Sequence, residues 1–170
     1  MSIALRRARS GDAEFLLQLI TDEETRPFLG LRGVESLEDV VGDIERSEAE
    51  PDAFGWFVVE VDGERAGSVS FRRTNERNRI VEAGRFAIQP SFRGRGIGVD
   101  AAKAFQRHLL VALGFHRIEL QIYGFNERAI AHAERCGYVR EGVKRRAYLK
   151  HGEWQDAVLF SLLQEDLRPE

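Results

Sequence analysis

The six residues from 93 to 98 have the types and spacing of an anion-binding loop. They read Arg93-Gly94-Arg95-Gly96-Ile97-Gly98 and separate an apolar segment ending at Ile88 from a segment with helical periodicity. A glycine-rich turn between a strand and a helix directs free backbone N–H groups and the positive end of the helix dipole to one place. Glycine lets an anion approach the backbone closely, and arginine adds charge-assisted hydrogen bonds. The segment therefore predicts a phosphate site, with contacts from the backbone and from both arginines.

Two common phosphate-binding loops fit this segment less well. A dinucleotide-binding loop has the spacing Gly-x-Gly-x-x-Gly directly after a strand, whereas here the spacing is Gly94-x-Gly96-x-Gly98 after several intervening residues. Glu119 has the spacing of a ribose-binding acid, but it lies inside a predicted strand rather than at its end. An ATP-binding loop needs Gly-Lys followed by Ser or Thr, which the chain lacks. A nucleotide-binding domain is therefore the weaker interpretation.

The elements that must position this loop can be predicted from hydrophobic periodicity and turn residues. Apolar residues at helical spacing predict helices over 13–20, from 36 onward, from 98 onward and over 126–137. Asp62-Gly63 and His151-Gly152 predict the turns of two hairpins. Strands are expected near the amino terminus and over residues 56–61, 66–71, 80–88, 118–122, 138–150 and 154–163. This order predicts an α/β fold, with a mixed, mostly antiparallel sheet flanked by helices.

Length and composition predict one domain over residues 1–170. The 170 residues are 43% hydrophobic and 31% charged, which excludes a disordered or low-complexity chain. The single cysteine, Cys136, excludes an intramolecular disulfide and is expected to be a small buried hydrophobe rather than a nucleophile. The amino terminus lacks the pattern of a secretory signal, and no run approaches the roughly 18 apolar residues of a membrane span. We therefore expect a cytoplasmic protein without a membrane partner.

Charge is distributed unevenly, although the formal net charge is only −3. Residues 1–62 hold 15 acidic and 6 basic side chains, a balance of −9, whereas residues 63–170 hold 13 and 19, a balance of +6. These charges either cover a solvated surface or separate a site for a cationic amine from a site for a phosphate ligand. The negative net charge, without a basic run interleaved with aromatics, argues against nucleic-acid binding. The four histidines show no metal-ligand spacing, so we expect no metal.

The loop and its surroundings resemble a known family. The segment from Arg93 to Gly98 is similar to the Arg/Gln-x-x-Gly-x-Gly/Ala signature of the GNAT superfamily of acyl-CoA-dependent N-acetyltransferases. The predicted order of elements also resembles that family over almost the whole chain. Glu82-Ala83-Gly84 and Pro90, three residues before Arg93, agree further with this superfamily. Three downstream patterns are similar to the branch that contains ribosomal-protein N-terminal acetyltransferases and spermidine acetyltransferases: Asn126-Glu127-Arg128-Ala129-Ile130, Glu134-Arg135-Cys136-Gly137-Tyr138 and the closing Gly152…Asp156…Phe160-Ser161-Leu162.

The resemblance implies direct transfer of an acetyl group from acetyl-CoA, bound as a co-substrate, to an amine. It assigns the pyrophosphate of CoA to Arg93, Gly94, Arg95, Gly96, Ile97 and Gly98. It assigns the pantetheine arm to Phe86, Ala87 and Ile88, which would pair with that arm like an added strand. A backbone N–H near Ile88 would polarise the thioester carbonyl. Asn126, predicted as a helix N-cap, would also contact the pantetheine arm. Arg128 and Arg135 either contact CoA phosphates or are exposed helix arginines without a specific role.

Glu82 is the best candidate for the catalytic base of this reaction. Side chains of equal parity on a strand point the same way, so Glu82 is expected to share a face with Gly84, Phe86 and Ile88. Apolar neighbours would raise the pKa of its carboxyl group and suit it to take a proton from an ammonium group through water. A glutamate on the surface or on an edge strand is the alternative interpretation.

The general acid is where the sequence departs from the family. Several members carry a tyrosine seven positions after the asparagine of the second motif, and others carry a serine three positions after it. These positions are Ala133 and Ala129 in this chain, so neither hydroxyl is present. Solvent, Asn126 or a tyrosine elsewhere would then supply the proton, or the thiolate would leave unaided. Tyr138 is expected to pack in the core. The departure leaves open an alternative function, a non-catalytic sensor or regulatory module of the same fold that binds acyl-CoA.

The acceptor is expected to be a primary amine: a protein N-terminus, a polyamine or another cationic small molecule. In this fold the two amino-terminal helices and the last hairpin line the acceptor pocket, and the first third of this chain is acidic. The acidic residues expected there are Asp22, Glu23, Glu24, Glu35, Glu38, Asp39 and Asp43, with Phe28, Phe54 and Trp56 as apolar walls. Relatives in this branch are often dimers, so the resemblance leaves a homodimer open.

Overall fold

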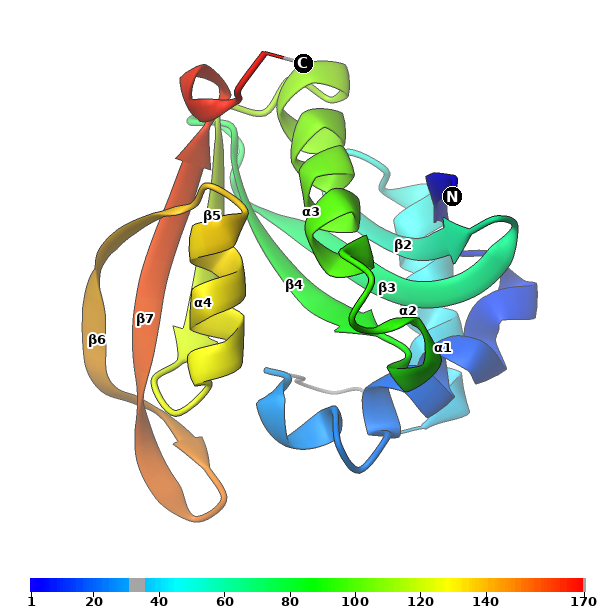
Figure 1. Cartoon of the computed structure of the whole chain (residues 1–170), viewed down its shortest axis with the longest axis horizontal. Helices are drawn as coiled ribbons and strands as arrows, with labels where there is room; N and C mark the ends of the chain where they lie inside the picture. The colour runs from blue at the N-terminus through cyan, green and yellow to red at the C-terminus, as the bar shows by residue number, and fades with distance from the viewer. Residues whose placement is uncertain (31–35, 170) are drawn as a thin grey trace.

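A seven-stranded sheet organises the chain in the computed structural model, which describes residues 1–30 and 36–169 (Figure 1). Its order is β1-β2-β3-β4-β5-β7-β6. The strands are β1 (Ile3–Arg7), β2 (Phe54–Val61), β3 (Glu64–Asn75), β4 (Ile80–Ile88), β5 (Arg117–Tyr123), β6 (Val139–Lys150) and β7 (Glu153–Leu163). The helices are α1 (Ala13–Thr21), α2 (Leu37–Ala49), α3 (Ile97–Arg107) and α4 (Glu127–Arg135).

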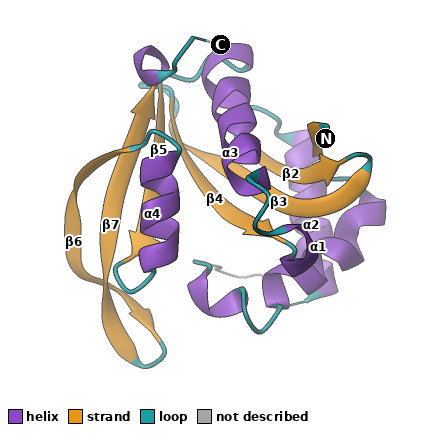
Figure 2. Ribbon diagram, viewed as in Figure 1, coloured by secondary structure: helices purple, strands orange, loops and turns teal. Residues whose placement is uncertain are grey.

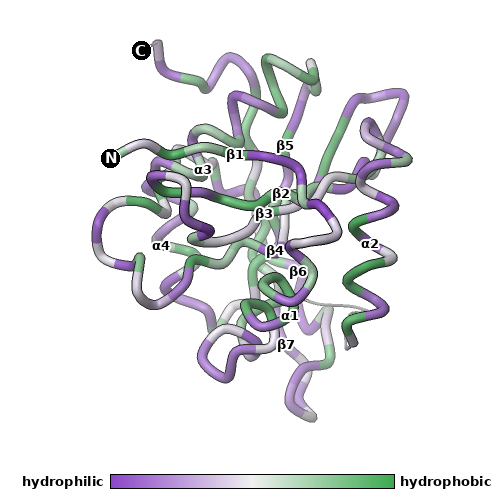
Figure 3. The backbone as a smooth tube through the Cα atoms, turned by 90° about the vertical axis from the view of Figure 1, so that its right-hand side faces the viewer, coloured by the Kyte–Doolittle hydropathy of each residue, from purple (hydrophilic) through white to green (hydrophobic). Residues whose placement is uncertain are grey.

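Helices cover both faces of this sheet (Figure 2). On one face, Leu16 of α1 and Ile44 of α2 are buried in one cluster with Trp56 of β2. On the other, Phe105 of α3 is buried with Phe71 of β3, and α4 lies over β5 and β7. Figure 3 shows α2 on one side of the strands and α3 and α4 on the other, with hydrophobic and hydrophilic segments alternating along α2. Burial of these apolar faces is the main favourable contribution to folding.

The sheet divides between β4 and β5, its one parallel pair among the described residues. These two strands pair only where Ile80–Glu82 meets Arg117–Glu119. Beyond this short ladder they diverge, as Figure 1 shows. In the described part of the chain, the β5-facing edge of β4 from 83 to 88 therefore has no strand partner. Apart from the Ile88 carbonyl oxygen, which accepts from Arg93, its backbone groups can pair with a ligand.

A β-bulge interrupts β4 within this open stretch. Ser70 of β3 pairs with Gly84 and Ser68 pairs with Ala87, so two residues of β4 lie opposite one of β3. Arg85, one of the two, has a φ of 49°, and the Ser68 hydroxyl donates to its carbonyl oxygen at 2.9 Å. A bulge shifts the alternation of side chains along a strand.

The expected common face of Glu82, Gly84, Phe86 and Ile88 is therefore wrong. Before the bulge, the odd-numbered residue Ala83 packs with the cluster below α3, so Glu82 and Gly84 face the α1–α2 side. After it, the even-numbered residues Phe86 and Ile88 pack on the α3 side. The bulge thus separates the candidate base from the side chains expected beside it.

The predicted mixed α/β class, order of elements and mostly antiparallel sheet are confirmed. The hairpin strands are longer than expected, because β2 begins at Phe54 and β3 extends to Asn75. The third helix begins at Ile97, one residue before the expected start. Among the described residues, none of the helices is long and apolar enough to cross a membrane.

Candidate functional site

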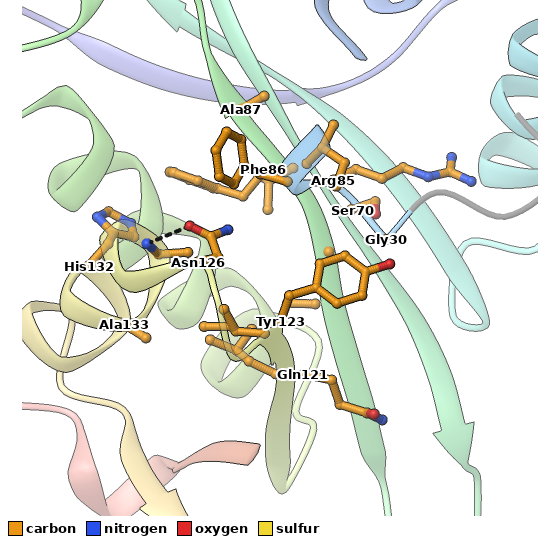
Figure 4. Close-up of a pocket in the computed structure, with 18 of the residues that line it drawn as sticks. Gly30, Ser70, Arg85, Phe86, Ala87, Gln121, Tyr123, Asn126, His132 and Ala133 are labelled. Carbon is orange, nitrogen blue, oxygen red and sulfur yellow. Dashed lines mark hydrogen bonds between the residues drawn. The ribbon is translucent and has the colours of Figure 1, made fainter. Parts of the chain in front are cut away.

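The divergence of β4 and β5 opens a cleft of about 1500 Å³. Residues of both strands line it, together with the start of α3, one side of α4, and the β6–β7 hairpin. Figure 4 shows side chains from β4, β5 and α4 converging on this space. The cleft brings together residues that lie far apart in the sequence, including Glu82, Phe86, Gly96 and Asn126.

The predicted anion loop lies at one end of this cleft. Gly94 and Gly96 have φ values of 83° and 76°, in the left-handed region where a side chain is strained. A Cβ added at either glycine would meet no atom within 4 Å, so the backbone conformation rather than packing requires glycine there. Because α3 begins at Ile97, the N–H groups of its first turn have no acceptor within the helix. This end of the cleft therefore suits an anion.

The two arginines of the loop have protein partners. Arg93 Nε donates to the Ile88 carbonyl oxygen at 3.0 Å, and its Nη2 donates to the Thr25 hydroxyl at 3.3 Å. Arg95 Nη2 donates to the Ser91 carbonyl oxygen at 2.9 Å. In this arrangement both side chains support the loop, and their contacts with phosphate remain a prediction. Ile97 is only 1% exposed, and neither Ile97 nor Arg95 is among the residues that line the cleft.

The open edge of β4 leads from the loop into the cleft. Ala87 and Ile88 are buried, whereas the ring of Phe86 faces the cleft and stacks on His132 of α4, with centroids 5.0 Å apart. An extended ligand that carries amide groups can pair with such an edge as an added strand does. The geometry is therefore compatible with a pantetheine arm along Phe86–Ile88, which remains a prediction.

Asn126 caps α4 at the side of the cleft, as expected. Its Oδ1 accepts a hydrogen bond from the Ala129 backbone N–H at 3.1 Å (Figure 4). The side-chain amide nitrogen then remains as a donor on a residue that lines the cleft and is 8% exposed. Arg128, in the first turn of α4, and Arg135, at its end, line the same cleft. Whether Asn126 and Arg128 bind a ligand stays a prediction.

Glu82 lies at the point where β4 and β5 separate. Its Oε2 accepts a hydrogen bond from Gln121 Nε2 of β5 at 3.0 Å, and its Oε1 accepts one from Arg72 Nη2 of β3 at 3.3 Å. The side chain is 24% exposed and lines the cleft. The expected apolar surroundings of Glu82 are therefore wrong, because its neighbours are hydrogen-bond donors. Its role as a base stays a prediction.

Sequence reasoning missed three residues in the cleft. Gln121 contacts Glu82, and Tyr148 of β6 donates a hydrogen bond to Gln121. His132 lies between Phe86 and the start of α3, where its Cε1 is 3.4 Å from a Cβ built on Gly98. Burial lowers the pKa of His132, and the nearby Arg135 lowers it further. Alternation along β5 was a signal for Gln121, a polar residue between two apolar ones, but no local pattern indicates the other two.

The structure also shows where the positions considered for the general acid lie, and where the single cysteine lies. Ala129 and Ala133 line the cleft, so it lacks hydroxyl groups at both positions. Tyr138 packs against two core clusters, as expected, and burial raises its pKa. Cys136 is 3% exposed, and burial raises the pKa of its thiol to about 11, which suits a buried hydrophobe rather than a nucleophile.

The acceptor end of the cleft is less acidic than the sequence suggests. Of the expected carboxylates, Glu24 and Asp43 line it, and they form ion pairs with Arg93 at 3.5 Å and Arg85 at 2.7 Å. Asp39 instead caps α2 in a reciprocal pair of hydrogen bonds with Ser36, and Glu35 lies outside the described residues.

Only some of the expected apolar walls of the acceptor end lie in the cleft. Phe28 and Phe54 line the cleft. Trp56 is fully buried below α1 and α2, so its expected place in the wall is wrong. Among the described residues, no group of three or more His, Cys, Asp or Glu side chains is arranged to hold a metal ion.

Known proteins are similar to this chain in sequence. A family model described as an acetyltransferase (GNAT) domain matches residues 2–139. The spermidine N(1)-acetyltransferase of Escherichia coli (strain K12) is 30% identical over 108 residues, which cover 64% of this chain and 58% of that enzyme. The chain thus matches little more than half the length of that curated relative. The putative ribosomal N-acetyltransferase YdaF of Bacillus subtilis (strain 168) is 27% identical, over 96% of this chain and 92% of that protein.

Solved structures share the fold. The spermidine N-acetyltransferase from Vibrio cholerae in complex with CoA and spermine has a TM-score of 0.86 and 23% identity, covering 97% of each chain. A probable acetyltransferase has a TM-score of 0.80 and 27% identity, covering 96% of this chain and 93% of that one. These likenesses confirm the fold class that the order of elements predicted.

Proposed function

The chain belongs to the GNAT acetyltransferase domain family, and from this premise we propose that it transfers an acetyl group from acetyl-CoA to a primary amine. The proposal treats residues 1–170 as one catalytic domain. One observation carries it: the anion loop, the open edge of β4 and the carboxylate of Glu82 line one continuous cleft. The loop suits a pyrophosphate, the strand edge suits the amides of a pantetheine arm, and the carboxylate suits a base.

These features support one arrangement of the acetyl donor in the cleft. The N–H groups at the start of α3 would hold the pyrophosphate, with positive charge from Arg128 nearby. Phe86, Ala87 and Ile88 would bind the pantetheine arm, with the Asn126 amide nitrogen as a further donor. A backbone N–H near Ile88 would then face the thioester carbonyl and stabilise the negative charge that develops on its oxygen.

The acceptor must lose protons for the transfer to proceed. The ammonium form gives one proton to Glu82 through a water molecule, and the nitrogen lone pair then forms a bond with the acetyl carbon. The C–S bond breaks, CoA leaves as a thiolate that takes a proton, and the nitrogen loses its second proton. Each cycle yields one amide and one CoA thiol, and it releases one proton.

The acceptor class is proposed from the relatives and from the cleft. Proteins similar to this chain are named as spermidine and putative ribosomal N-acetyltransferases, which favours a polyamine, another cationic small amine or a protein N-terminus. Phe28 and Phe54 offer apolar contacts at that end of the cleft, and Glu24 lies there with 72% of its side chain exposed. A cationic amine can compete with Arg93 for this carboxylate, because an exposed ion pair is weak.

An acceptor screen with a binding control tests the proposal. Thiol release from acetyl-CoA is followed with spermidine, amino-terminal peptides and neutral aryl amines, while thermal shifts are recorded with acetyl-CoA, NAD and ATP. We expect release with at least one cationic amine and the largest shift with acetyl-CoA. A thermal shift with acetyl-CoA but no thiol release with any amine would instead support the non-catalytic sensor. The alanines at 129 and 133, which lack the hydroxyl groups of other family members, favour that alternative. A larger shift with NAD or ATP would contradict acyl-CoA binding.

A further inference from the structure

We propose that Gln121 and Tyr148 are positioning residues that hold the carboxylate of Glu82 toward the acceptor amine. The inference rests on the proposed role of Glu82 as the base. A chain of hydrogen bonds carries it: the Tyr148 hydroxyl donates to Gln121 Oε1 at 2.5 Å, and Gln121 Nε2 donates to Glu82 Oε2 at 3.0 Å. All three residues line the cleft.

The place of Gln121 on β5 explains why a side chain is needed there. The ladder between β4 and β5 ends at the pair Glu82 and Glu119, and Gln121 is the second residue beyond that pair. Past this point the backbones diverge, so backbone hydrogen bonds no longer fix the distance between the strands. The amide of Gln121 spans the gap and ties the Glu82 carboxylate to β5. Figure 4 shows Gln121 extending from β5 on the same side as Tyr123.

The neighbours of Gln121 determine which way its amide faces. Lys144 Nζ lies 3.4 Å from the same Oε1 that accepts from Tyr148. An ammonium group can only donate, so the amide oxygen must face Lys144 and Tyr148. The NH₂ group must then face Glu82, and Arg72 donates to the other carboxylate oxygen. Both oxygens of Glu82 thus accept hydrogen bonds, which fix the orientation of its carboxylate.

An irregularity in β6 brings together Lys144 and Tyr148, the two donors to Gln121 Oε1. In a regular strand, residues four apart are separated by about 13 Å. Here the register with β7 shifts between Lys144 and Tyr148, and Arg146 between them has a φ of 50°. The Arg146 backbone N–H donates to Asp156 Oδ1 at 2.8 Å, which fixes the kink. The distorted segment therefore lets Lys144 and Tyr148 reach the same oxygen, Gln121 Oε1, although they are four residues apart.

The variants Gln121→Leu and Tyr148→Phe test the inference. We expect Gln121→Leu to lower kcat about tenfold with an unchanged KM for acetyl-CoA, because the base is misdirected while the donor site is intact. Tyr148→Phe should lower kcat by a smaller factor, since Lys144 still orients the amide. Gln155→Leu is the matched control, because Gln155 on β7 donates to the Lys150 carbonyl oxygen instead, and it should keep full activity.

The double variant Glu82→Gln/Gln121→Leu separates positioning from general damage to the fold. If Gln121 acts through Glu82, the double variant should have the same kcat as Glu82→Gln alone. If the losses in kcat of the two single variants Glu82→Gln and Gln121→Leu multiply in the double variant, the inference is overturned. Full activity in Glu82→Gln would instead remove the base from the proposed function. Reduced activity in Glu82→Gln beside full activity in Gln121→Leu and Tyr148→Phe would overturn the positioning role alone.

Discussion

Replacing Gly96 by alanine tests whether the backbone of the loop forms the anion site. Gly96 has a φ of 76° and precedes the first residue of α3. A residue with a side chain is less stable in this conformation by roughly 1–2 kcal/mol. The added methyl group would meet no protein atom within 4 Å, so the cost comes from the backbone conformation and not from a clash. The variant should therefore fold with a free energy of unfolding lower by about 1–2 kcal/mol.

The Gly96→Ala variant should also bind CoA more weakly than the wild type. If the backbone relaxes to a negative φ, the N–H groups beside Gly96 turn away from the anion. One charge-assisted hydrogen bond contributes about 1.5–3 kcal/mol. Since about 1.4 kcal/mol corresponds to a factor of ten, the Kd for CoA should rise roughly 10- to 100-fold.

Calorimetric titration with CoA and urea unfolding measure both effects. Gly42→Ala is the matched control, because Gly42 lies within α2, has no neighbour within 4 Å of its added Cβ and is remote from the loop. It should bind CoA normally and be stabilised by about 1 kcal/mol, the difference in helix propensity. A Gly96→Ala variant that binds CoA within twofold of the wild type would refute the reasoning.

Three further predictions concern stability and reactivity. Asp12 is 3% exposed, and although burial alone would raise its pKa, hydrogen bonds from Arg6 and the Arg9 backbone lower it, so Asp12→Ala should reduce the free energy of unfolding in urea by about 3 kcal/mol. Burial lowers the pKa of His108 and of His132; the unfolded chain then binds protons first, so stability measured in urea should fall as the pH drops through about 6.5, and less steeply in His108→Gln. With a thiol pKa near 11, Cys136 should react slowly with a thiol reagent in the folded protein at pH 8 and rapidly in urea, and fast labelling of the folded protein would contradict its burial.

Local signals in the sequence were enough to predict the loop, the Asn126 cap and both hairpin turns. Each depends on residues close together in the chain: glycines before a helix, an amide at its first position, or a turn pair between two alternating runs. The same holds for the order of elements, because hydrophobic periodicity reports which face of each segment is buried.

The bulge in β4 could not be predicted in this way. One of its two residues, Arg85, adopts a positive φ that arginine rarely takes, and it is held there by Ser68 of a neighbouring strand and by an ion pair with Asp43 of α2. No periodicity within 80–88 signals it. A strict alternation therefore placed Glu82 beside Phe86, and the error follows from a contact between distant segments.

The contacts around Glu82 were hidden for a similar reason. Gln121, 39 residues away in the chain, contacts Glu82 where the strands diverge, and Tyr148, 27 residues beyond Gln121, contacts Gln121 from the kinked β6. The acidic first third also suggested a more acidic acceptor end than the structure has, because charge counted along the sequence does not show which carboxylates already have partners. Asp39 caps α2, and Asp43 forms an ion pair with Arg85.

The turnover of the Glu82→Gln variant tests the central claim most directly. With an amine acceptor that the wild type uses, kcat is measured by thiol release and the Kd for acetyl-CoA by calorimetry. The loss of a general base should lower kcat by about 100-fold or more, and the Kd should stay within twofold because the anion loop is intact. An unchanged kcat would contradict the assignment of Glu82 as the base that accepts the proton of the amine.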